Sequence, residues 1–208
     1  YKPTIYSLNH ERERKIEYLF SRDSRDDLFF PTRGSNTKVI LKFAGLGGDE
    51  NYLKGTGEWS RFITFTDYLI YANRIKVGML TSTKQEKPVL PHNRFYLGGG
   101  RSIRGFAEKA LGPKDKYGAP RGGNYLFLTN FELRFHLFYK FWSTLFVDVG
   151  NLWENVDEVK LTQLRVTGGW GISLRTPVGP IRFDYAYHLR KLDEPVEPRW
   201  HLGVLYAF

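Results

Sequence analysis

The feature that most constrains the fold is a regular alternation of bulky apolar and polar residues in the second half of the chain. From 181 to 189 every odd-numbered residue is large and apolar or aromatic, whereas the even-numbered positions hold Arg182, Asp184, Ala186 and His188. A period of two places these two sets on opposite faces of a β-strand. The same pattern recurs over Tyr125–Phe138, Ser143–Gly150, Arg165–Arg175 and Trp200–Phe208. The sequence therefore predicts five consecutive strands, each with one apolar and one polar face.

Weaker alternation upstream predicts four further strands. They are expected near Lys15–Asp23, Asn36–Ala44, Tyr52–Phe65 and Leu69–Leu80, which makes about nine strands in all. Turn-rich joints such as Phe29–Asn36 and Thr176–Pro180 separate the strands. No segment has a helical period, so the predicted class is all-β; Tyr1–His10 is left open as a tenth strand.

The apolar face is the property that separates a membrane barrel from a soluble sandwich, which remains an alternative. Aromatic residues make up 16% of the chain, whereas the mean hydropathy is only -0.42. No apolar run approaches the roughly 18 to 20 residues of a helical membrane span, which excludes helical integral membrane proteins. Uniformly large apolar faces opposite charged ones favour an antiparallel transmembrane β-barrel.

Several functional classes find no support in the residues. The net charge is +9, but the Lys and Arg residues are scattered and form neither a recognition helix nor a basic tail, so nucleic acid is not an expected partner. The chain has no cysteine, and its five histidines are dispersed. It has no G-x-S-x-G elbow and no Ser, His and acid cluster. The sequence therefore predicts no enzyme, no metal and no cofactor.

One long loop, at about residues 84–123, interrupts the strand pattern. Its length far exceeds that of a hairpin connection, so it is either functional or disordered. The stretch FYLGGGRSIRGF, Phe95–Phe106, is too aromatic for simple disorder, and its glycines permit turns that other residues cannot make. It lacks the G-x-G-x-x-G register and the Lys-Ser/Thr ending of nucleotide loops and precedes no helix. A functional loop that binds no nucleotide is therefore expected.

Four motifs carry a family resemblance. The loop residues resemble the [V/I]RGF loop of the outer-membrane assembly barrel superfamily, also called the bacterial surface antigen family; they are Gly99, Gly100, Arg101, Ser102, Ile103, Arg104, Gly105 and Phe106. Asp26–Asn36 resembles the FPT-x-G connection, Phe146–Gly150 the F-x-D-x-G strand and Gly179–Ala186 the penultimate-strand motif. The motifs occur in the family's order, and the resemblance covers roughly residues 15–208.

The resemblance implies that the loop folds back into the barrel lumen, where Arg104 meets acidic groups on the wall. The alternation places Glu132 and Asp148 on the inward faces of adjacent strands. We therefore expect Arg104 to pair with Asp148, with Glu132 near enough to share the charge, because a guanidinium forks well to carboxylates. Phe146 and Gly150, from the same motif strand, complete the predicted wall.

The loop also bears on the size of the barrel. An eight-stranded barrel is filled by its own side chains and has no space for such a loop, whereas the family's sixteen strands leave that space. We therefore predict that residues 1–208 are the C-terminal part of one sixteen-stranded barrel domain. A naturally short member of the family is the alternative.

The segment Trp200–Phe208 is expected to form the final strand, with Phe208 on its apolar face. Its residues fit an outer-membrane targeting pattern of a polar residue, a glycine and two aromatics, here His201, Gly203, Tyr206 and Phe208. In the family the first and last strands pair weakly, so that the seam between them can open. Gly203 is expected to make this strand labile and to permit a kink.

The resemblance implies a factor that assembles and inserts outer-membrane β-barrel proteins through this lateral seam. Its expected partners are unfolded outer-membrane proteins, outer-membrane lipid or lipopolysaccharide, and periplasmic accessory proteins. Its expected location is the bacterial outer membrane, with an organelle outer envelope as the alternative. A polypeptide-translocating pore of the same superfamily, of the two-partner secretion or organelle import type, and a passive structural barrel are rival functions.

Overall fold

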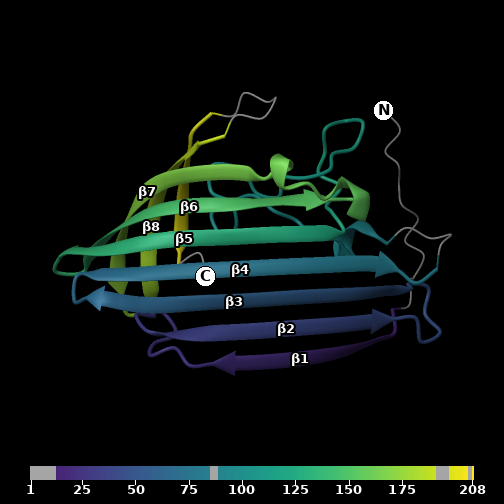
Figure 1. Ribbon diagram of the computed structural model, residues 1–208, viewed down its shortest axis with the longest axis horizontal. Helices are drawn as coiled ribbons and strands as arrows, with labels where there is room; N and C mark the ends of the chain where they lie inside the picture. The colour runs from purple at the N-terminus through teal and green to yellow at the C-terminus, as the bar shows by residue number, and fades with distance from the viewer. Residues whose placement is uncertain (1–12, 85–88, 191–196, 206–207) are drawn as a thin grey trace.

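The computed structural model describes residues 13–84, 89–190, 197–205 and 208. Its strands form one antiparallel sheet in which each strand pairs with its neighbours in the sequence (Figure 1). The strands are β1 Lys15–Asp23, β2 Gly34–Ala44, β3 Tyr52–Thr66, β4 Leu69–Ser82, β5 Tyr125–Phe138, β6 Phe141–Trp153, β7 Arg165–Thr176, β8 Gly179–His188 and β9 Arg199–Val204. Single-turn 3-10 helices lie in the connections at Pro91–Asn93, Val156–Glu158 and Leu161–Gln163. The predicted all-β class is confirmed.

The strand bounds agree with the alternation except at the ends. β1 and β5 begin and end where the sequence predicts, and β6 extends beyond the expected Ser143–Gly150 at both ends. β9 is shorter than predicted, because it ends at Val204 and does not continue to Phe208. The possible tenth strand at Tyr1–His10 lies outside the described residues.

The sheet is curved, and its two faces differ as the period of two requires. On β6, Leu145 is 51% exposed on the convex face, whereas Thr144, Phe146 and Asp148 are at most 3% exposed on the concave face. The described residues contain a single sheet, so the soluble two-sheet sandwich is wrong for them. None of them forms a helix long and apolar enough to cross a membrane.

The connection between β4 and β5 packs as a plug against the concave face. Its buried apolar side chains join one cluster with strand residues; the loop contributes Phe95, Leu97, Ile103, Phe106 and Leu111, and the strands contribute Ala44, Tyr52, Leu80, Leu126, Leu128 and Leu152. Antiparallel bridges tie Phe95 to Gly123 and Leu97 to Leu111 within the loop. Each fully buried apolar side chain stabilises the docked loop by about 1.5–3 kcal/mol.

Candidate functional site

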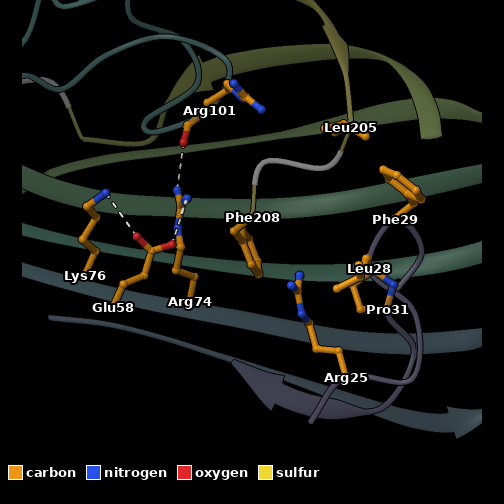
Figure 2. Close-up of a pocket in the computed structure, with 10 residues that line it drawn as sticks. All are labelled: Arg25, Leu28, Phe29, Pro31, Glu58, Arg74, Lys76, Arg101, Leu205 and Phe208. Carbon is orange, nitrogen blue, oxygen red and sulfur yellow. Dashed lines mark hydrogen bonds and ion pairs between the residues drawn. The ribbon is translucent and has the colours of Figure 1, made fainter. Parts of the chain in front are cut away.

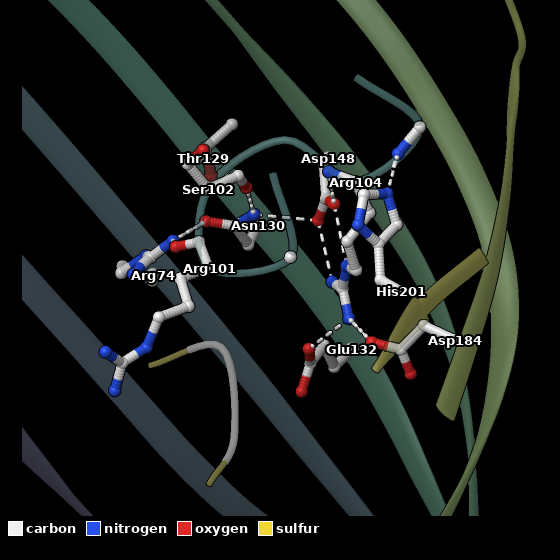
Figure 3. A network of polar contacts seen from close by, with 12 residues as sticks. Arg74, Arg101, Ser102, Arg104, Thr129, Asn130, Glu132, Asp148, Asp184 and His201 are labelled. Atoms are coloured by element: carbon white, nitrogen blue, oxygen red, sulfur yellow. Dashed lines mark hydrogen bonds and ion pairs between the residues drawn. The ribbon is translucent and has the colours of Figure 1, made fainter. Parts of the chain in front are cut away.

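Arg104 lies at the centre of the site and is completely buried between the loop and the wall formed by β5 and β6 (Figure 3). Its Nε and Nη2 donate to the two carboxylate oxygens of Asp148 at 2.8 and 2.7 Å, and its backbone N–H donates to Asp148 Oδ2 at 3.0 Å. Its Nη1 donates to Glu132 Oε1 at 2.8 Å. The structure thus brings together the three residues expected to meet, in a bidentate, charge-assisted geometry.

Phe146 and Gly150 shape the wall around this contact. The guanidinium carbon of Arg104 lies 3.5 Å from the centroid of the Phe146 ring, a distance suited to a cation–π interaction. A Cβ atom on Gly150 would lie 2.5 Å from the Phe127 carbonyl oxygen and 3.0 Å from Ile103 Cδ1. Glycine therefore leaves room for Ile103, which is fully buried.

The ion pair is part of a larger buried cluster of three arginines and three carboxylates. Arg134 donates to Glu132 Oε2 through Nε at 2.9 Å and Nη2 at 2.7 Å. Arg182 Nε lies 3.2 Å from Asp184 Oδ2, and Arg104 Nη1 lies 3.6 Å from the same oxygen. With all six groups ionised, the three guanidinium groups balance the three carboxylates, and this pairing offsets part of the cost of burying each member.

Asn130 connects this cluster to β4 and is not part of any of the four motifs. Its Oδ1 accepts hydrogen bonds from Arg74 Nε and Nη2 at 2.9 and 2.7 Å. Its Nδ2 donates to the Ser102 carbonyl and to Asp148 Oδ1, both at 2.7 Å. The signal in the sequence is its place two residues before Glu132, on the same inward face.

The two ends of the motif loop contact the last two strands. The Gly105 N–H, at a residue with φ +92°, donates to His201 Nε2 at 2.9 Å. At the other end Arg182 Nη2 donates to the Gly100 carbonyl at 3.0 Å. Gly99 also has a positive φ, +101°. These two glycines adopt the conformations that the sequence analysis expected only glycine to reach.

Arg101 and Phe106, also predicted motif residues, lie in different environments. The Arg101 side chain is exposed, and its carbonyl accepts a hydrogen bond from Arg74 Nη2 at 2.9 Å. The Phe106 ring is buried and stands edge-on to His188, with centroids 4.5 Å apart. Arg101 therefore contributes backbone to the site, and Phe106 contributes packing.

The C-terminal segment departs from the predicted strand. Leu205 has a positive φ of +72°, and the Phe208 ring lies on the concave side, 6.1 Å from the Phe62 ring and 5.0 Å from the Arg74 guanidinium. The expectation that Phe208 continues the apolar outer face is therefore wrong. The physical reason is that Phe62 of β3 and Arg74 of β4 contact the ring on the concave face of the sheet.

Gly203 does not form the kink, since it lies within β9 and pairs with Arg182. A Cβ atom on Gly203 would lie 3.4 Å from Arg182 Nη2, so the glycine leaves room for that guanidinium. The chain turns after Val204. His201 lies on the concave side, as its contact with Gly105 shows; Tyr206 lies outside the described residues.

A polar cavity of about 350 Å³ opens beside Phe208 (Figure 2). It is lined by Arg25, Leu28, Phe29, Pro31, Glu58, Arg74, Lys76, Arg101, Leu205 and Phe208. Two of its cations are paired with carboxylates, because Lys76 Nζ lies 3.1 Å from Glu58 and Arg25 Nη2 lies 2.7 Å from Asp23. In the described parts of the chain, no group of three or more His, Asp or Glu side chains is placed to hold a metal ion.

The comparison with known proteins decides the family. A family model described as the Omp85 superfamily domain matches residues 6–208. The chain belongs to the Omp85 superfamily. The resemblance read from the four motifs is thereby confirmed.

Individual Omp85 relatives agree with this assignment. The chain is 28% identical over 191 residues to the outer membrane protein assembly factor BamA of Nitratidesulfovibrio vulgaris, which covers 88% of the chain and 24% of the relative. It is 32% identical over 127 residues to the sorting assembly machinery 50 kDa subunit of Saccharomyces cerevisiae, which covers 59% of the chain and 25% of the relative. The chain thus spans about a quarter of the length of the curated relatives it matches.

A solved structure shows the same fold. The crystal structure of BamA from Haemophilus ducreyi lacking POTRA domains 1-3 matches with a TM-score of 0.75 at 21% sequence identity. The match covers 91% of this chain and 40% of that chain. The nine-stranded sheet therefore has the arrangement of strands found in part of a BamA barrel.

Proposed function

We propose that this chain forms the C-terminal nine strands of a sixteen-stranded barrel that folds and inserts other β-barrel proteins into the bacterial outer membrane. Membership of the Omp85 superfamily supports this role, as do relatives named as an outer membrane protein assembly factor and a sorting assembly machinery subunit. The convex face, with its large exposed apolar side chains, suits contact with membrane lipid. An organelle outer envelope is the alternative location.

The observation that carries the proposed lateral seam is the short, exposed final strand. β9 pairs with β8 over six residues, whereas β7 and β8 pair over ten. Each residue of β9 is at least partly exposed. Within the described sheet β9 has one neighbour, β8, so its other edge has backbone groups available for pairing. A strand of a client protein would pair with such an edge before it enters lipid, where unpaired backbone groups are costly.

The proposed work is conformational, with no covalent step and no cofactor. Its clients would be unfolded outer-membrane proteins. Further partners would be outer-membrane lipid or lipopolysaccharide and periplasmic accessory proteins. The loop held by Arg104 would occupy the lumen while clients use the seam.

Site-specific photocrosslinking in the full-length protein tests the route of the client. Leu202, on the convex face of β9 and 76% exposed, should crosslink to a client during insertion. Leu145, also convex but on β6, which has a neighbour on both sides, is the matched control and should not. If a client instead crosslinks to Lys76, which lines the cavity on the concave side, and not to Leu202, the result would reject the lateral seam and support a translocating pore.

Two further measurements separate assembly from a passive structural role. A disulfide that joins β9 to the first strand of the complete barrel should abolish insertion, and reduction should restore it. The chain contributes no cysteine of its own, so the pair can be introduced cleanly. Insertion that proceeds with the seam locked rejects the lateral route. If cells depleted of this protein still assemble their other outer-membrane barrels normally, the assembly role itself is rejected.

A further inference from the structure

Two histidines contact the backbone of Gly105, one at its N–H and one at its carbonyl. The Gly105 N–H donates to His201 Nε2 at 2.9 Å, and His188 Nε2 lies 3.2 Å from the Gly105 carbonyl oxygen. An amide N–H only donates and a carbonyl only accepts. His201 must therefore present a lone pair at Nε2, and His188 must carry a hydrogen there. We call this pair the histidine clamp.

The clamp joins the motif loop to the last hairpin, since His188 is the final residue of β8 and His201 lies within β9. Gly105 directly follows Arg104, the residue that β5 and β6 hold. At the other end of the motif, a Cβ atom on Gly100 would lie 3.5 Å from the His201 Cβ. The same short loop thus contacts two walls, one at Asp148 and one at the hairpin that ends the described sheet.

We propose that His201 couples undocking of the loop to separation of β9 from its neighbouring strand, so that each movement favours the other. His201 acts here as a positioning residue. The coupling rests on the proposed function in one respect, because opening of the proposed seam is what separates β9. Separation of β9 removes the acceptor of the Gly105 N–H, and undocking of the loop removes the donor bound to His201. Such a coupling is reciprocal: whatever releases one element increases the release of the other.

Hydrogen exchange of the full-length protein in lipid vesicles tests the contact itself. A glutamine at 201 can place an amide oxygen near the Nε2 position, whereas a methionine of similar length cannot accept a hydrogen bond from an amide as well. His201→Met should increase exchange in the 99–106 segment about twofold to tenfold, the effect of one lost neutral hydrogen bond. His201→Gln should restore the native rate. His136→Met, at a histidine that contacts the Tyr139 carbonyl in the β5–β6 turn, is the control and should change nothing in this segment.

Coupling is measured by combining these variants with Asp148→Asn, which loosens the loop from the other wall. With His201 or Gln at 201, Asp148→Asn should increase exchange in β9 as well as in the loop. With Met at 201, the increase should stay in the loop, so the two substitutions should be non-additive. Equal rates for the Gln and Met variants, or a β9 response that does not depend on residue 201, would overturn the proposal.

These outcomes are independent of assembly activity, because no client is present in the exchange measurement. Coupled exchange in a protein that inserts no client would reject the proposed function and keep the clamp. Normal insertion combined with additive exchange would reject the clamp and keep the proposed function.

Discussion

Replacing Arg104 by leucine tests how the loop between β4 and β5 is held. Asp148 accepts three hydrogen bonds from Arg104 and one from Asn130. The substitution removes the two that come from the guanidinium. Glu132 keeps its two bonds from Arg134. The cost therefore falls mainly on Asp148, a completely buried carboxylate that loses its paired cation.

Removing one partner of a buried ion pair costs about 3–5 kcal/mol. The lost cation–π contact with Phe146 is worth about 0.5–2 kcal/mol, and apolar packing of leucine on the same ring recovers part of it. About 1.4 kcal/mol changes an equilibrium tenfold. We therefore expect the fraction of molecules with an undocked loop to rise about 100-fold to 3,000-fold.

Thiol labelling of an Ile103→Cys probe measures this fraction. Ile103 is fully buried and residues 1–208 contain no cysteine. With any cysteine outside these residues replaced, a water-soluble maleimide reacts only when the loop leaves the wall. Arg104→Lys should label at an intermediate rate, because an ammonium keeps the charge but not the bidentate fork. Arg101→Leu, at an exposed side chain, is the control and should label at the native rate. A native rate for Arg104→Leu would refute the ion-pair account and leave apolar packing as the force that holds the loop.

Three smaller perturbations test other contacts. Gly105→Ala should increase labelling of the same probe about fivefold to 30-fold, because φ of +92° costs a residue with a Cβ atom roughly 1–2 kcal/mol; an unchanged rate would contradict this. Gly150→Ala forces a Cβ atom to within 2.5 Å of a β5 carbonyl and should lower the temperature at which the folded barrel unfolds on heating, and an unchanged temperature would count against the close packing. Asp26 lies in the turn between β1 and β2; burial raises the pKa of its carboxyl, but hydrogen bonds from Thr32 and neighbouring backbone N–H groups more than offset this and hold the pKa below its usual value. Its stabilising effect is therefore present above about pH 4 and lost at lower pH, so Asp26→Asn should speed hydrogen exchange in the turn at neutral pH and make no difference near pH 2, whereas a difference that persists in acid would contradict the sign.

Much of the site could be predicted because a strand's own geometry decides which side chains share a face. Successive side chains point to opposite faces whatever the rest of the protein does. Glu132 and Asp148 could therefore be placed on the inner wall without coordinates, and the motif around Arg104 supplied their partner. The nine strands followed from the same period, with errors mainly at their ends.

Asn130 shows what the period of two leaves undecided. Its contacts depend on the register, which sets Asn130 opposite Asp148 on β6 and opposite Arg74 on β4. A shift of either neighbouring strand would give the amide other partners. Register depends on turn geometry and on packing across the whole sheet, and an uncharged amide carries no signal of its partners in the sequence.

The C-terminal segment is a second case in which contacts with distant residues override the local sequence pattern. Alternation of side chains continues to Phe208, and on local grounds the strand should continue with it. The chain turns inward because Phe62 and Arg74, from strands far earlier in the sequence, lie across the curve of the sheet and receive the aromatic ring. Local pattern thus specified the faces of the strands, whereas the partners of each face were decided by the register and curvature of the sheet, because only these bring residues of distant strands within contact distance.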